Sequence, residues 1–195
     1  CILDIGATRT QATPQIEYLA DLASECFVPL AYGGGIDSVK RMNQIFTIGF
    51  EKCIINSAFY RTPGLITEAA NEFGSQSVVV SIDVKRKLLG GYEVFSNSGK
   101  QKTGLTPLDA AKKAQDLGAG EILLTAIDRE GTMNSYDITV NSFVGSTDQA
   151  QRNADTKIVL LPAGVKTKQI VKAWLKGERV EVNVEEDTDR KTRSP

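Results

Sequence analysis

The sequence predicts an α/β fold, and more specifically a (β/α)8 barrel of the TIM type that is incomplete. Runs of β-branched residues alternate with segments of helical period, which implies a parallel sheet with helices outside it, either closed or doubly wound. Two strand ends rich in glycine or small polar residues, together with an internal repeat, favour the closed barrel. The 195 residues fall short of the roughly 250 that a complete barrel uses, so we expect one domain that is not whole.

Short apolar runs mark the expected strands. They lie at residues 2–5, 28–32, 52–56, 77–83, 121–126 and 157–161. Between the fourth and fifth runs, residues 87–102 combine the pair Gly90-Gly91 with an alternating Tyr-Glu-Val-Phe stretch. That combination predicts a β-hairpin inserted after the fourth strand.

Amphipathic helices are expected between the strands, where apolar residues recur at three- and four-residue spacing. These segments are residues 14–25, 38–48, 63–73, 107–117 and 167–175. Pro63 and Pro107 stand at the start of their segments, where a helix tolerates proline because the missing N–H would have had no partner there.

Composition narrows the classes of function. Lys and Arg total 23 against 24 Asp and Glu, so no overall field favours nucleic acid or an anionic membrane as a partner. The absence of histidine removes Ser-His-Asp and Cys-His catalysis and argues against a zinc site. No apolar run approaches the roughly 18 residues of a membrane-spanning helix. We therefore expect a cytoplasmic protein with no metal and no cofactor, whose acid–base chemistry comes from carboxylates or lysines.

A glycine-rich turn follows the second expected strand, in the run YGGGI at residues 32–36. Gly34 and Gly35 would let main-chain N–H groups approach an anion at the start of the next helix. The cap of that helix would be Asp37 or Ser38. A tight turn also needs glycine for its backbone conformation, so the run suits a phosphate site without requiring one.

Two small polar residues, Asn56 and Ser57, end the third expected strand. They either cap the next helix or bind the same phosphate as the glycine turn. An internal repeat adds to the case for a barrel, because residues 158–183 echo residues 30–56 in order and in glycine placement. A repeat at this spacing is typical of a barrel built from two related halves.

Carboxylates lie at or near the ends of three expected strands, at Asp4, Asp83 and Asp128. In a barrel these ends face one mouth, where two carboxylates can act as general acid and base. An aspartate at a βα junction often only caps the next helix. We favour catalysis for Asp83, because a hairpin rather than a helix follows it.

Three runs carry a resemblance to a known family: YGGGI at 32–36, GSQSVVVSIDVKR at 74–86 and GAGEILLTAIDREGT at 118–132. They resemble the cyclase subunit of imidazole glycerol phosphate synthase, from Leu3 to about Ile138. The resemblance implies a (β/α)8 barrel and a lyase of histidine biosynthesis. It also implies a heterodimer with a glutaminase (amidotransferase) subunit, whose ammonia passes through the barrel core. The cyclase uses that ammonia on a phosphorylated ribotide, forming imidazole glycerol phosphate and an aminoimidazole carboxamide ribotide.

A second branch of the same family remains an alternative. The run ASECFVP at 23–29 looks closer to the paralogous subunits of surface-polysaccharide gene clusters, which deliver ammonia for an acetamidino sugar. A sister isomerase of histidine synthesis shares the barrel, but the run GSQS at 74–77 and the run DREGT at 128–132 favour the cyclase.

The resemblance implies a role for each matching residue. Asp83 matches a catalytic aspartate that serves as acid or base on the glycerol-phosphate side of the substrate, and Asp4 matches one that helps hold substrate. Lys52 and Glu121 match charges at the opposite end of the barrel, where ammonia enters. The residues implied for the two phosphate sites are Gly34, Gly35, Asn56 and Ser57 for the first, and Glu130, Gly131 and Thr132 for the second.

The ends of the chain depart from the family pattern. The first strand, with a second catalytic aspartate, would lie before Cys1, so we expect it to be missing. The last βα units are degenerate, and at residues 161–164 a proline removes an N–H donor from the second phosphate cradle. We expect residues 1–184 to form a partial barrel and residues 185–195 a charged disordered tail. A catalytically impaired phosphate-binding barrel fragment is therefore a further alternative.

Overall fold

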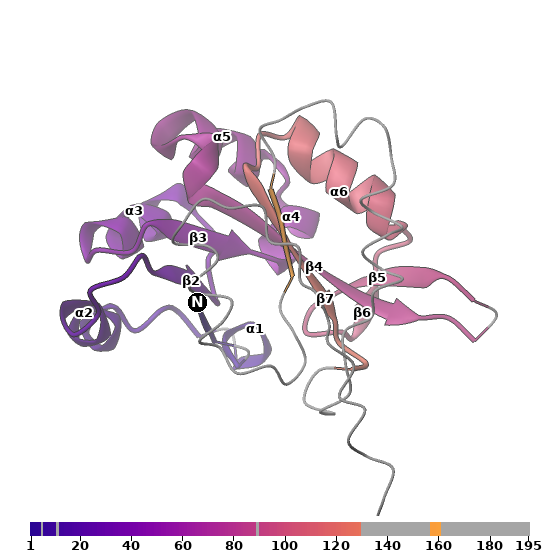
Figure 1. Cartoon of the computed structure of the whole chain (residues 1–195), viewed down its shortest axis with the longest axis horizontal. Coiled ribbons are helices and arrows are strands. Elements are labelled where there is room, and N and C mark those ends of the chain that lie inside the picture. The colour runs from indigo at the N-terminus through magenta and orange to yellow at the C-terminus, as the bar shows by residue number, and fades with distance from the viewer. Residues whose placement is uncertain (5, 11, 89, 130–156, 161–195) are drawn as a thin grey trace, which may run out of the picture. The chain divides into compact units, whose positions relative to one another are not determined.

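The computed structural model describes residues 1–4, 6–10, 12–88, 90–129 and 157–160 (Figure 1). The chain divides into two units, Cys1–Gly164 and Val165–Pro195, and every element described below belongs to the first unit. The helix expected at 167–175, the boundary expected at 184 and the tail expected at 185–195 lie outside the described residues.

A sheet with six parallel strands forms the centre of the described part of the chain. Its members are β1 (Ile2–Leu3), β2 (Ala31–Gly33), β3 (Lys52–Ile55), β4 (Val78–Arg86), β7 (Glu121–Ala126) and β8 (Lys157–Leu160). Each pairs in parallel with the next in chain order. A doubly wound sheet reverses its direction of growth partway, so that alternative is wrong. The strand order is that of a barrel wall, and the predicted α/β fold with a curled, barrel-like sheet is confirmed.

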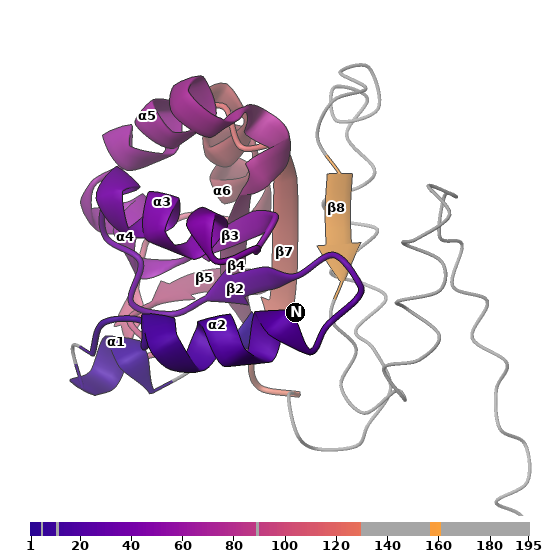
Figure 2. The same cartoon turned by 90° about the vertical axis from the view of Figure 1, so that its left-hand side faces the viewer.

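Helices α2 (Ile16–Ser24), α3 (Val39–Thr47), α5 (Gly64–Phe73) and α6 (Pro107–Asp116) cover the outer face of this sheet (Figure 2). Right-handed crossovers that all advance in one direction place every helix on the same face. The four helices match the expected segments closely. Pro107 is the first helical residue of α6, as predicted, and Thr106 caps that helix by accepting a hydrogen bond from the Asp109 N–H at 3.2 Å.

The two faces of the sheet bury different residues. Cys53 and Val80 point outward and belong to a large core shared with the helices. Ile54, Val79 and Leu123 point inward and form a small separate cluster. This alternation follows from the two-residue period of a strand. Among the described residues, the inner face therefore carries only a small apolar cluster beside its polar side chains.

The hairpin predicted after the fourth strand is confirmed as β5 (Tyr92–Ser96) and β6 (Gln101–Lys102). β5 pairs antiparallel with the last residues of β4, with Asp83 opposite Phe95. The expectation that the fourth strand ends at Asp83 is wrong, because the hairpin supplies backbone partners that extend β4 to Arg86. Asp83 therefore lies within a strand that is hydrogen-bonded beyond it.

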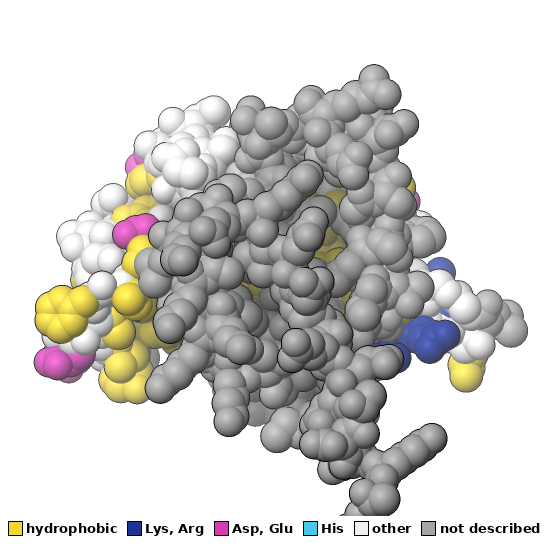
Figure 3. Space-filling view, in the orientation of Figure 1, with side chains coloured by type: hydrophobic (Ala, Val, Ile, Leu, Met, Phe, Trp, Pro, Cys, Tyr) yellow, Lys and Arg dark blue, Asp and Glu magenta, His cyan; other side chains and the backbone are white. Residues whose placement is uncertain are grey.

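Three short elements have no counterpart in the sequence-based prediction: α1 (Ala7–Thr10), α4 (Ser57–Arg61) and the 3₁₀ turn η1 (Ser75–Ser77). None is long enough to show a helical period. Figure 3 shows hydrophobic side chains gathered over α2 and Lys and Arg side chains near the hairpin. Among the helices that the structure describes, none has the length and apolarity to span a membrane.

Candidate functional site

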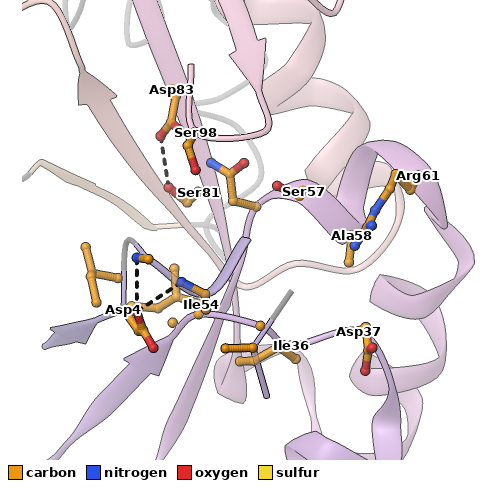
Figure 4. A pocket seen from close by; sticks show the side chains of 18 of the residues that line it. Asp4, Ile36, Asp37, Ile54, Ser57, Ala58, Arg61, Ser81, Asp83 and Ser98 are labelled. Carbon is orange, nitrogen blue, oxygen red and sulfur yellow. Dashed lines mark hydrogen bonds between the residues drawn. The ribbon is translucent and has the colours of Figure 1, made fainter. Parts of the chain in front are cut away.

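A cavity of about 770 Å³ opens at the carboxyl ends of the parallel strands (Figure 4). Six residues that the sequence singled out line it: Asp4, Gly34, Gly35, Asn56, Ser57 and Asp83. They come from four strands and the turns that follow them, so a sheet that grows in one direction is what brings them together. Glu130, Gly131 and Thr132 lie outside the described residues.

The glycine turn is built for close approach of the backbone. Gly34 and Gly35 have positive φ angles of 143° and 62°. A Cβ at Gly34 would lie 2.6 Å from the Cβ of Asp4, and one at Gly35 would lie 2.4 Å from the carbonyl oxygen of Ala12. Both positions therefore need glycine for conformation and for space. Ser38 occupies the N-cap position of α3, and its side chain makes no capping hydrogen bond.

An ion pair stands beside this turn. Arg41 Nε donates to Asp37 Oδ1 at 2.7 Å, and the Ser38 hydroxyl donates to the same oxygen at 3.2 Å. Burial by itself would raise the pKa of Asp37, but the hydrogen bonds and the positive charge of Arg41 outweigh it and hold that pKa below its usual value. Asp37 is therefore ionised, and its carboxylate is the ion-pair partner of Arg41.

Asp4 acts as a local cap. Its Oδ1 accepts hydrogen bonds from the backbone N–H groups of Gly6 and Ala7, each at 3.0 Å. That is the structural role which a carboxylate at a βα junction commonly has. The side chain also lines the cavity, so the substrate-holding role stays a prediction for Asp4.

Asn56 stands at the N-cap position of α4 without capping it. Its side chain makes no capping hydrogen bond, and its Oδ1 is buried with no hydrogen-bond partner among the described residues. A buried polar atom of this kind usually has a partner, from water or a ligand if not from protein. Of the two interpretations left open for Asn56, this geometry favours ligand binding over capping.

Asp83 lies half-buried on the inner face of β4. The Ser81 hydroxyl is 3.5 Å from Asp83 Oδ1 on the same face, and Ser98 of the hairpin turn lies close by (Figure 4). Burial and then the negative charge of Asp83 raise the pKa of the Tyr60 hydroxyl, so Tyr60 stays protonated. The Tyr60 hydroxyl has no hydrogen-bond partner among the described residues. Asp83 is thus a half-buried carboxylate that lines the cavity.

Lys52 and Glu121 form an ion pair, and only 14% and 8% of their side chains are exposed. They are the first residues of β3 and β7, so they lie at the end of the sheet opposite the cavity. The third strand-associated carboxylate, Asp128, is exposed and accepts a hydrogen bond from the Arg86 N–H at 3.2 Å. It ties the end of β4 to the turn after β7 and is not among the residues that line the cavity.

Several polar residues of the cavity were not anticipated from the sequence, among them Arg41, Arg61, Ser98 and Lys100. The first two stand on the helices that follow the glycine turn and Asn56. Arg41 lies in the first turn of α3, where a basic residue beside a predicted anion site would have been a usable signal, whereas Arg61 ends α4 and had no such signal. The other two come from the hairpin turn. In the described part of the chain, no group of three His, Cys, Asp or Glu side chains could hold a metal ion.

Comparison with known proteins identifies the family. A family model described as "Histidine biosynthesis protein" matches residues 1–151. The HisF subunit of imidazole glycerol phosphate synthase from Alkaliphilus metalliredigens is 44% identical over 138 residues, which is 71% of this chain and 55% of the relative. The HisF subunit from Chloroherpeton thalassium is 46% identical over 135 residues, 69% of this chain and 53% of the relative.

A third relative, from Pseudomonas aeruginosa, carries the provisional name imidazole glycerol phosphate synthase subunit hisF2. It is 43% identical over 136 residues, 70% of this chain and 54% of the relative. The chain thus spans about half the length of the curated relatives it matches. It belongs to the histidine biosynthesis protein family, as a homologue of the HisF cyclase subunit of imidazole glycerol phosphate synthase.

Proposed function

We propose that this chain is the cyclase part of an imidazole glycerol phosphate synthase. In this role it takes ammonia from a glutaminase partner and forms imidazole glycerol phosphate and an aminoimidazole carboxamide ribotide. The observation that carries the proposal is the cavity itself, in which Asp83 shares one mouth with the glycine turn and Asn56.

Phosphate binding is assigned to the turn at Gly34 and Gly35 together with Asn56 and Ser57. The two glycines keep side chains away from the backbone, so N–H groups at the start of α3 can point at an anion. The carboxamide of Asn56 can donate from its NH₂ group to a phosphate oxygen while its Oδ1 accepts from water or ligand. The phosphate therefore fixes one end of the substrate at this side of the cavity.

Proton transfer is assigned to Asp83. It lies on β4 while the glycine turn follows β2, so a substrate held by its phosphate would extend across the inner face toward this carboxylate. Ring closure requires protons to be removed and returned, and a carboxylate within hydrogen-bond reach of the reacting atoms can do both. The partly buried position of Asp83 limits competition from bulk water.

The entry of ammonia is assigned to the end of the strands opposite the cavity. Lys52 and Glu121 mark that end, and the small inward cluster of Ile54, Val79 and Leu123 lies between it and the cavity. Ile54 also lines the cavity, so the apolar layer adjoins the site directly. A neutral ammonia molecule suits an apolar passage, whereas the ammonium ion would lose solvation there.

The run at residues 23–29 favours one second candidate, the paralogous subunit that delivers ammonia for an acetamidino sugar in surface polysaccharide. Its chemistry uses the same end-to-end route for ammonia. The two candidates differ in the ligand at the cavity, so the phosphorylated ribotide substrate of the cyclase distinguishes them.

Binding of that ribotide to the full chain tests the proposal, by titration calorimetry with Asn56→Ala and Asn43→Ala. We expect Asn56→Ala to weaken binding by about 10- to 100-fold, since a hydrogen bond to a charged group contributes roughly 1.5 to 3 kcal/mol. Asn43 is exposed on α3, so its variant should bind normally. Equal affinity in the two variants would contradict the phosphate assignment, and no binding at all would favour the acetamidino branch.

A further inference from the structure

We propose that Arg61 makes the glycine-turn end of the cavity selective for a doubly charged phosphate monoester over a singly charged or neutral group. This inference rests on the proposed function, because it names the charge state of the ligand bound there. Neither the resemblance nor the comparisons assign a role to Arg61. Arg61 lines the cavity.

Position is the first support. Arg61 ends α4, the short helix that begins at Ser57, and it lines the same cavity as Gly35 and Asn56. Figure 4 shows its side chain running along α4 toward Ala58. Arg61 therefore contributes to the wall of the cavity that the glycine turn and Asn56 also line.

Charge balance is the second support. Two arginines line this end, but Arg41 is held by Asp37 at 2.7 Å. Among the residues that the structure describes, Arg61 has no ion pair. Its positive charge is thus available to a ligand. A guanidinium group presents several N–H donors in a planar fork, which matches the oxygens of a phosphate.

The chemistry of the ligand follows from this arrangement. A phosphate monoester loses its second proton near pH 6, and the second negative charge strengthens its attraction to a nearby guanidinium. Affinity should therefore rise as pH increases through about 6. The other charged groups of the cavity are Asp4, Asp37, Asp83, Arg41 and Lys100. Because the sequence has no histidine, no side chain there has an ordinary pKa near 6.

The experiment measures binding of ribose 5-phosphate to the full chain at about pH 5 and about pH 7.5, across the second ionisation of the phosphate. Arg61→Gln removes the charge, and Arg61→Lys keeps it but loses the fork. Arg86→Gln is the matched control, since Arg86 is exposed on β4 and does not line the cavity. Circular dichroism on each variant checks that the fold is retained.

We expect wild type and Arg86→Gln to bind about tenfold more tightly at the higher pH, and Arg61→Gln to gain only about twofold. Arg61→Lys should keep most of the gain. Equal pH dependence in wild type and Arg61→Gln would overturn the role of Arg61 while leaving the phosphate site intact. Loss of the gain in Arg61→Lys as well would also overturn it, because charge would then not be the cause. If wild type fails to bind ribose 5-phosphate, the phosphate site and this inference fall together.

Discussion

At Gly35 the backbone turns with a φ of 62°, and a Cβ added there would lie 2.4 Å from the carbonyl oxygen of Ala12. Two separate physical needs meet at this residue, a left-handed conformation and empty space where a side chain would stand. From the sequence alone, the glycine at this position had two possible explanations, the backbone conformation of a tight turn or the binding of an anion. The conformational reason is now directly visible, and the short distance to Ala12 could not be predicted because it depends on the loop that follows β1.

Gly35→Ala should destabilise the protein by about 1 to 3 kcal/mol, because alanine is strained at this φ and its Cβ would meet a backbone oxygen at 2.4 Å. Gly64→Ala is the matched control. Gly64 lies in the first turn of α5 with nothing within 4 Å of the added Cβ, so this change should be neutral or stabilise by up to about 1 kcal/mol. Urea unfolding of both variants measures the difference. Equal stabilities would show that the turn is not constrained as described.

The place of Arg61 in the cavity was not predicted, because it too depends on how separate segments of the chain pack together. Nothing in the order of residues shows that a side chain at the end of α4 lines the same cavity as a glycine turn that follows another strand. Asn56 and Ser57 were found because they stand at the end of an apolar run, where a strand gives way to a helix. Patterns in the sequence thus locate residues at strand ends better than residues that reach the cavity from a helix.

Among the elements, β7 matches its predicted range of 121–126, and α3, α5 and α6 lie within a residue of theirs at each end. β2 begins at Ala31 rather than at Val28. The apolar residues Phe27 and Val28 are 97% and 45% exposed, so they belong to a loop although their side chains resemble those of a strand. Apolar character alone does not distinguish a buried strand from an exposed loop, because burial is decided by the rest of the fold.

The ion pair between Lys52 and Glu121 joins the starts of β3 and β7 across β4, and both side chains are largely buried. Glu121→Gln should lower stability by roughly 3 to 5 kcal/mol, because it leaves a buried ammonium group without this carboxylate. The double change Lys52→Met with Glu121→Leu should recover much of that loss, since it removes both charges together. Thermal or urea unfolding of the single and double variants provides the measurement. A double variant no more stable than the single one would contradict the account of this pair.

At the scale of the whole molecule, the two ends of the parallel strands carry different kinds of side chain. The carboxyl ends of its strands hold Asp83, the glycine turn and Asn56, and the other end holds the buried pair of Lys52 and Glu121. Within the described residues, β1 and β8 each have a single strand neighbour. The sequence predicted this separation of ends because parallel strands carry the same direction throughout. It could not predict how Asp83 is held, because the extension of β4 depends on pairing with the hairpin.

Ammonia-dependent turnover of the phosphorylated ribotide, compared between Asp83 and Asp83→Asn, tests the central claim most directly. The chain would be assayed with Asp116→Asn on the exposed surface of α6 as the control. Asparagine keeps the size of the side chain and removes the proton-transfer group, so we expect turnover to fall by at least about 100-fold while ribotide affinity changes little. Turnover that survives in Asp83→Asn would show that another carboxylate performs the chemistry.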